Sequence, residues 1–132
     1  MSVGSWDPAA QATELNESVL EELLEAAERL ESDDFGLSTE AVARLVGVAR
    51  ADRVAWTEAA ENLDDAKLEA LIRLYTLAEG RFPAWEAGAQ SPVVVLAKAL
   101  RTRGTYPKAL TAWVKAHSDN KFLPYGSLLD RL

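Results

Sequence analysis

The stretch LDDAKLEALIRLYTLAEG, residues 63–80, decides the fold class of this chain. Its apolar side chains recur every three or four residues, the spacing that lines one face of an α-helix. They are Leu68, Leu71, Ile72, Tyr75 and Ala78. Asp64 stands where an N-cap is expected, with Leu63 and Leu68 at the two positions of a hydrophobic staple around it. Gly80 follows the last apolar turn, so we predict an amphipathic helix from Asp64 to Gly80.

Four other segments show helical spacing or capping residues. They span residues 15–32, 38–62, 92–104 and 107–118. The segment 92–104 has the sharpest ends, because Ser91-Pro92 is an N-cap followed by proline and Gly104 is a typical C-terminal glycine. No alternating β-branched run indicates a strand. We therefore predict an all-α, single-domain helical bundle over residues 1–132. It has about five helices, the last two forming a C-terminal hairpin, and an extended Pro/aromatic tail.

Charge is divided unequally along the chain. Residues 1–66 carry 16 acidic side chains against 4 arginines, a net charge of −12. Residues 67–132 carry 5 acidic against 10 basic side chains, a net charge of +5, and the whole chain has −7. Such a division favours electrostatic pairing within the molecule, between two copies, or with a partner.

Composition excludes several classes of protein. The chain has no cysteine, so disulfides, thiolate metal sites and cysteine nucleophiles are excluded. No apolar run approaches the ~20 residues of a membrane-spanning helix. The N-terminal residues lack the basic and apolar regions of a signal peptide. We expect a cytoplasmic protein with no membrane partner, and the acidic net charge argues against general attraction to nucleic acid.

A segment within residues 39–57 resembles the helix-turn-helix pattern of bacterial DNA-binding proteins. Ala43 precedes Gly47 by four residues, and apolar residues flank that glycine, as in the pattern. The resemblance implies a DNA-binding regulator that presents Arg50 and Arg53 to the major groove. However, Arg53 stands where the pattern has an apolar residue. The alternative interpretation is one continuous helix that contains a glycine.

The C-terminal part of the chain combines basic and aromatic residues. The candidate partner-binding residues are Trp85, Arg101, Arg103, Lys108, Lys115, Phe122 and Tyr125. Exposed aromatics among basic groups bind single-stranded nucleic acid by stacking, or hold a protein partner that the charges steer. The other interpretation is a solvated face that complements the acidic first helix, in the same chain or in a second copy.

Two aromatic-proline segments, residues 81–85 and 122–126, concentrate large side chains outside the predicted helices. Loops seldom carry such side chains unless these pack onto something. The segments either clamp onto the protein's own helices or form an anchor surface for another protein, since tryptophan and tyrosine dominate interface hot spots.

The sequence offers no catalytic constellation. His117 is the only histidine, no nucleophile elbow is present, and neither a Gly-rich phosphate loop nor a second histidine for zinc exists. We expect His117 to hydrogen-bond near the end of its own helix. The prediction is a non-catalytic protein-interaction or regulatory protein, without cofactor or metal, whose partner is another protein or a second copy of the chain.

Overall fold

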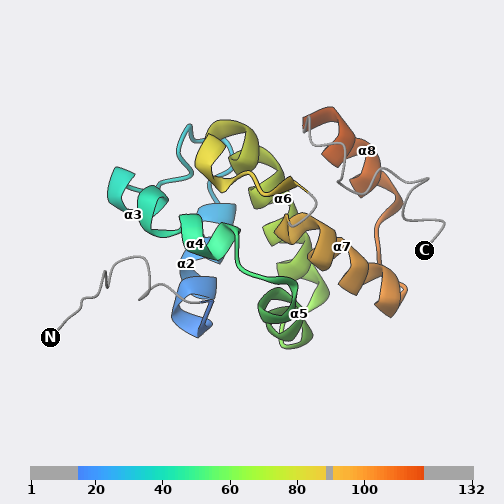
Figure 1. Cartoon of the computed structure of the whole chain (residues 1–132). Helices are drawn as coiled ribbons and strands as arrows, with labels where there is room; N and C mark the ends of the chain where they lie inside the picture. The colour runs from blue at the N-terminus through green and yellow to red at the C-terminus, as the bar shows by residue number, and fades with distance from the viewer. Residues whose placement is uncertain (1–14, 89–90, 118–132) are drawn as a thin grey trace, which may run out of the picture.

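The computed structural model describes residues 15–88 and 91–117 (Figure 1). In this part of the chain seven α-helices and one 3₁₀ turn form an all-α bundle without strands. Their bounds are α2 Glu17–Ala27, α3 Thr39–Arg44, α4 Val46–Ala49, α5 Arg53–Glu61, α6 Asp65–Arg81, η1 Pro83–Trp85, α7 Pro92–Arg103 and α8 Lys108–His117. The predicted fold class is confirmed, whereas the predicted tail lies outside the described residues.

Helix α6, which contains most of the stretch 63–80, lies at the centre of the bundle (Figure 1). Asp64 caps it by accepting a hydrogen bond from the Lys67 backbone N–H at 2.9 Å. All five predicted core positions of this helix are buried, and α2, α7 and α8 pack against it. Because neighbours cover α6 on several sides, it buries further side chains that a single apolar stripe does not include: Leu74, Thr76 and Glu79.

The prediction of one continuous helix over residues 38–62 is wrong, because the chain forms three helices there, α3, α4 and α5. Ser38 caps α3 by accepting a hydrogen bond from Ala41 N–H at 3.1 Å. Asp52 is a further N-cap, accepting from Ala55 N–H at 2.9 Å, and so starts a new helix. This break moves Arg53 to an exposed first turn, whereas an unbroken helix would bring its charge onto the apolar face.

The ends of the other helices follow local chemistry. Asn16 caps α2 through Val19 N–H at 2.9 Å, and α2 ends earlier than predicted, at Ala27. Ser91 caps α7, and Gly104 ends it in the left-handed region with φ 76°, where a side chain would be strained. Helix α8 follows α7 after a short connector and rests chiefly on α6.

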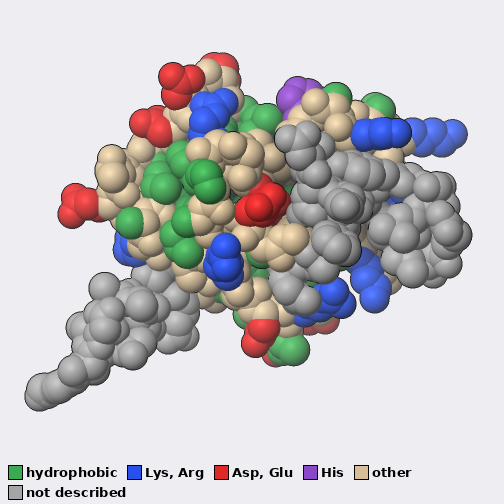
Figure 2. All heavy atoms as spheres, turned by 45° about the horizontal axis from the view of Figure 1, so that its top comes forward, with side chains coloured by type: hydrophobic (Ala, Val, Ile, Leu, Met, Phe, Trp, Pro, Cys, Tyr) green, Lys and Arg blue, Asp and Glu red, His purple; other side chains and the backbone are tan. Residues whose placement is uncertain are grey.

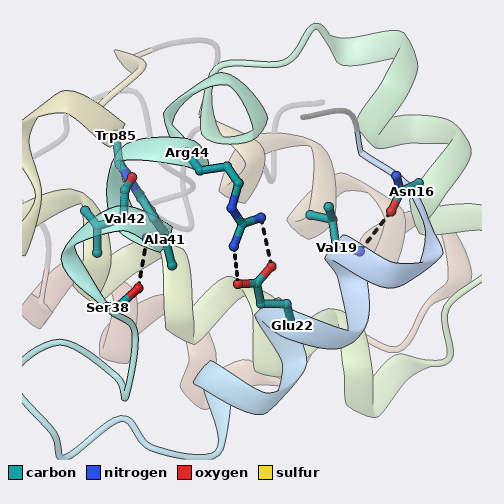
Figure 3. A network of polar contacts seen from close by, with 8 residues as sticks. All are labelled: Asn16, Val19, Glu22, Ser38, Ala41, Val42, Arg44 and Trp85. Atoms are coloured by element: carbon teal, nitrogen blue, oxygen red, sulfur yellow. Dashed lines mark hydrogen bonds and ion pairs between the residues drawn. The ribbon is translucent and has the colours of Figure 1, made fainter. Parts of the chain in front are cut away.

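The connector after α6 packs onto the bundle. Trp85 is fully buried, its indole N–H donates to the carbonyl of Val42 at 2.9 Å, and its ring lies 5.0 Å from that of Phe82 (Figure 3). The first aromatic-proline segment therefore clamps onto the protein's own helices. The second, residues 122–126, lies outside the described part.

Candidate functional site

The largest buried side chain of helix α5 is that of Trp56. Trp56 is fully buried, its indole N–H donates to the Val48 carbonyl at 3.0 Å, and its ring meets that of Tyr75 edge-on at 5.5 Å. In Figure 1, α5 lies between α2 on one side and α7 on the other. The helix is thus a ridge with a groove on each side, and the two grooves form the candidate site.

The groove between α2 and α5, here called the acidic groove, has a volume of about 920 Å³. Its apolar walls come from α2, from the α4–α5 junction and from α5. They are formed by Leu15, Leu20, Leu24, Val48, Ala51, Ala55, Ala59 and Leu63. Small side chains on α5 leave this space open, since alanine at positions 55 and 59 fills little of it. Gly47 adds to the opening, because a Cβ there would meet nothing within 4 Å.

Carboxylates stand along this groove. Glu17 and Glu21 come from α2, Asp52 and Glu58 come from the start and the middle of α5, and Lys67 is the one cation among the described residues of the lining. Glu17, Glu21 and Glu58 are exposed and form no ion pair with any residue between 15–88 or 91–117. The groove therefore combines apolar side chains with an acidic rim whose charge the described parts of the chain leave largely uncompensated.

Glu22, the neighbour of Glu21, has a different role. Its carboxylate accepts two hydrogen bonds from the Arg44 guanidinium, at 2.6 and 3.1 Å, and so joins α2 to α3 (Figure 3). These hydrogen bonds raise the pKa of Arg44 against the opposing effect of burial. The acidic first helix thus pairs with an arginine of its own half of the chain, and α6 is the helix it packs against.

The second groove, between α5 and α7, is here called the basic groove. It has a volume of about 290 Å³, and Arg53, Lys98 and Arg103 line it against one acid, Glu61. The sequence assigned Arg53 to DNA binding and Arg103 to a C-terminal surface, but the fold brings both to this groove. No motif signalled this, because the two arginines are 50 positions apart in sequence.

The remaining helix-turn-helix residues do not follow the resemblance. Gly47 lies inside α4 and outside the positive-φ region, so it makes no turn. Arg50 caps the end of α4, and its guanidinium donates to the carbonyls of Ala84 and Glu86, both at 2.8 Å. Its exposed side chain joins the α4–α5 junction to the connector.

The predicted C-terminal residues have different surroundings in the structure. Trp85 belongs to the core, which corrects its assignment as a partner-binding anchor. The guanidinium of Arg101 lies 4.5 Å above the Tyr106 ring, and that of Arg103 binds the Asp65 carboxylate at 2.9 Å. Lys108 and Lys115 are exposed on α8. Phe122 and Tyr125 lie outside the described residues.

Figure 2 shows both acidic and basic side chains on one face, with most of the acidic ones towards the left and several basic ones towards the right of the view. The histidine lies at the surface in this view. His117 stacks on Trp113 with ring centroids 4.3 Å apart, and its Nδ1 lies 2.7 Å from the Trp113 carbonyl oxygen. This local contact agrees with the role expected for His117.

A polar contact in the core escaped the sequence analysis. The hydroxyl of Ser91 donates to the buried carboxylate of Glu79 and also accepts from Val93 N–H, so the N-cap of α7 is tied to α6. Tyr75, one turn before Glu79, is fully buried; burial, and to a smaller extent the charge of Glu79, raises the pKa of its hydroxyl. Neither residue lines the two grooves.

Among the described residues, no cluster of acids and histidine has the arrangement of a metal site. No described helix has both the length and the apolar character needed to cross a membrane. Comparison of the chain with protein-family models, with curated proteins and with solved structures finds no match.

Proposed function

We propose that this protein is a non-catalytic protein-interaction domain whose acidic groove receives a basic, amphipathic helix of a partner protein. The observation that carries the proposal is a groove of about 920 Å³ that combines apolar side chains with acidic ones that make no ion pairs in the described structure. Large grooves with apolar interiors are the usual docking sites for amphipathic helices.

The size and the charge of the groove select this occupant. A helix with its side chains is ~10–12 Å across, so a groove of this volume takes one face of a short helix. Apolar side chains of the partner would lie against Leu20, Leu24 and Ala59. Its lysines and arginines would meet Glu17, Glu21 and Glu58, which steer the encounter and disfavour acidic partners.

The direct test is fluorescence anisotropy with a labelled amphipathic Lys/Leu peptide of about 18 residues, long enough for five helical turns. A scrambled peptide of the same composition has the same charge but no apolar face. We expect the amphipathic peptide to bind at least about tenfold more tightly than the scrambled one, because only it buries apolar side chains in the groove. Equal affinity would reduce the interaction to net charge and contradict the proposal.

Two charge reversals on one helix locate the binding site. Glu58→Lys changes the rim of the acidic groove, whereas Glu61→Lys makes the same change in net charge one turn later, in the lining of the basic groove. We expect Glu58→Lys to weaken binding about tenfold or more and Glu61→Lys to weaken it far less. Similar losses in both variants would place the peptide elsewhere.

A second copy is the competing occupant. Analytical ultracentrifugation of the full chain, with and without the peptide, distinguishes the two. A monomer that binds the peptide supports the proposal. A dimer that Glu58→Lys dissociates would assign the groove to self-association and overturn it.

A further inference from the structure

The basic groove differs from the acidic groove in size as well as in charge. Its volume of about 290 Å³ is at the lower limit of small-molecule sites, which span ~300–1,000 Å³, and is too small for a helix. Its walls are apolar: Ala60 comes from α5, and Val94, Val95 and Ala99 come from α7. Thr57 and Thr102 add one hydroxyl from each helix.

The cations of this groove differ in their surroundings: Arg103 is held by hydrogen bonds, whereas Lys98 is exposed. Arg103 is preorganised, because its guanidinium donates to the Asp65 carboxylate at 2.9 Å and to the Ala60 carbonyl at 2.8 Å. Lys98 is exposed and forms no ion pair with another residue of the described ranges. With Arg53, they give three cations, against Glu61 in the lining and Asp65 beside Arg103, and the remaining positive charge favours a negatively charged ligand.

An apolar wall next to the ammonium of Lys98, which forms no ion pair in the described structure, selects a ligand with two parts. We propose that the basic groove binds a small amphipathic anion, a carboxylate carried on an apolar chain or ring. The apolar part lies against Val95 and Ala99, and the carboxylate lies beside the ammonium of Lys98. This site does not depend on the helix-docking function proposed for the acidic groove.

The test uses decanoate as the probe in isothermal titration calorimetry and in ¹⁵N NMR titration of the full chain. Acetate supplies the carboxylate alone, and decyltrimethylammonium supplies the chain with the opposite charge. We expect one decanoate per protein, with amide shifts concentrated in α5 and α7. We also expect binding by acetate and by the cationic detergent to be at least about tenfold weaker. Equal binding of decanoate and the cation would show that only the apolar wall matters and would overturn the proposal.

Matched variants assign the charge to one residue. Lys98→Glu should weaken decanoate binding by about tenfold or more, whereas Lys115→Glu, an equal charge change at an exposed position of α8, should leave it nearly unchanged. Ala99→Leu fills the groove without a charge change and should also weaken binding. Equal losses in the two lysine variants, or amide shifts centred on the acidic groove, would contradict the site.

An acidic polypeptide is the alternative ligand for the same cations. A Glu/Leu peptide of the length used for the acidic groove distinguishes this case by competition. Displacement of decanoate by that peptide at lower concentration would assign the groove to an acidic protein segment and overturn the small-anion proposal. Failure of the peptide to compete supports it.

Discussion

The side of α5 that faces α2 carries carboxylates around a wide apolar groove, whereas the side that faces α7 carries arginine and lysine around a narrow one. One helix of nine residues separates them. The neighbours supply most of the difference, because α2 comes from the acidic half of the chain and α7 from the basic half. The acidic and basic halves of the sequence thus contribute to opposite sides of α5. We expect each side to attract ligands of the opposite charge.

The largest expected effect is a loss of stability when the packing of α5 is disrupted. Trp56→Ala deletes the buried ring that holds α5 against α4 and α6, so the free energy of unfolding should fall by about 3–5 kcal/mol in urea titration. Both grooves should lose their ligands together. Trp113→Ala, at a half-buried position of α8, is the control and should preserve both binding activities. Retention of normal stability by Trp56→Ala would contradict the anchoring role.

The next prediction compares two arginines that are close in sequence, Arg50 and Arg53, by their effects on stability and on decanoate binding. Arg50→Ala removes two hydrogen bonds to the carbonyls of Ala84 and Glu86, and should lower the free energy of unfolding by about 1–2 kcal/mol. Arg53→Ala, at an exposed first turn, should cost less stability but weaken decanoate binding. Urea unfolding and calorimetry check both. Specific DNA binding that both changes abolish without loss of stability would favour the helix-turn-helix interpretation.

The pH dependence of the free energy of unfolding tests the burial of Tyr75, whose ring contacts Trp56 of α5. Burial raises the pKa of Tyr75 above its ordinary 10.0, so above pH 10 the unfolded chain loses this proton while the folded chain keeps it. Stability from this group is therefore complete below pH 10 and declines above it, by about 1.4 kcal/mol per pH unit. Tyr75→Phe should remove that part of the alkaline decline in urea unfolding at pH 9–11. Identical declines in the two proteins would refute it.

A cap substitution separates structure from charge on the acidic side. Asp52→Ala removes the side chain that accepts from Ala55 N–H and should cost about 1 kcal/mol in thermal or urea unfolding. Asp52→Asn keeps the cap and removes the charge, so stability should stay close to wild type while affinity for the basic peptide falls. If Asp52→Asn bound the peptide as well as wild type, this carboxylate would not belong to the binding rim.

The smallest effect compares two neighbouring glutamates of α2. Glu22→Gln weakens the exposed ion pair with Arg44 and should cost about 0.2–1 kcal/mol of stability, with peptide affinity preserved. Glu21→Gln should do the reverse, because Glu21 lines the groove and forms no ion pair in the described structure. Anisotropy and urea unfolding on the same two variants measure both. Equal peptide affinity of the two variants would mean that the position of a carboxylate on α2 does not matter for binding.

Much of the fold was predictable from local signals, because those signals act within a few residues. The caps at Asp64 and Ser91 and the terminal glycine at position 104 are each confirmed. The break before α5 was missed because Asp52 was not recognised as an N-cap within an apparently continuous apolar pattern. In hindsight, an N-cap residue just before a misplaced arginine was the available signal.

The sequence by itself determined the all-α class, the central helix and the acidic and basic halves, since periodicity, capping and charge are local properties. Only the tertiary structure decided which side chains share a groove. Arg53 and Arg103 face one space, and Glu21 and Glu58 face another, because α5 packs between α2 and α7. Packing likewise buried Trp85, which removed it from the surface that the pattern indicated, and placed backbone carbonyls within hydrogen-bond distance of Arg50. Such placements depend on contacts between residues distant in sequence, and no local pattern encodes them.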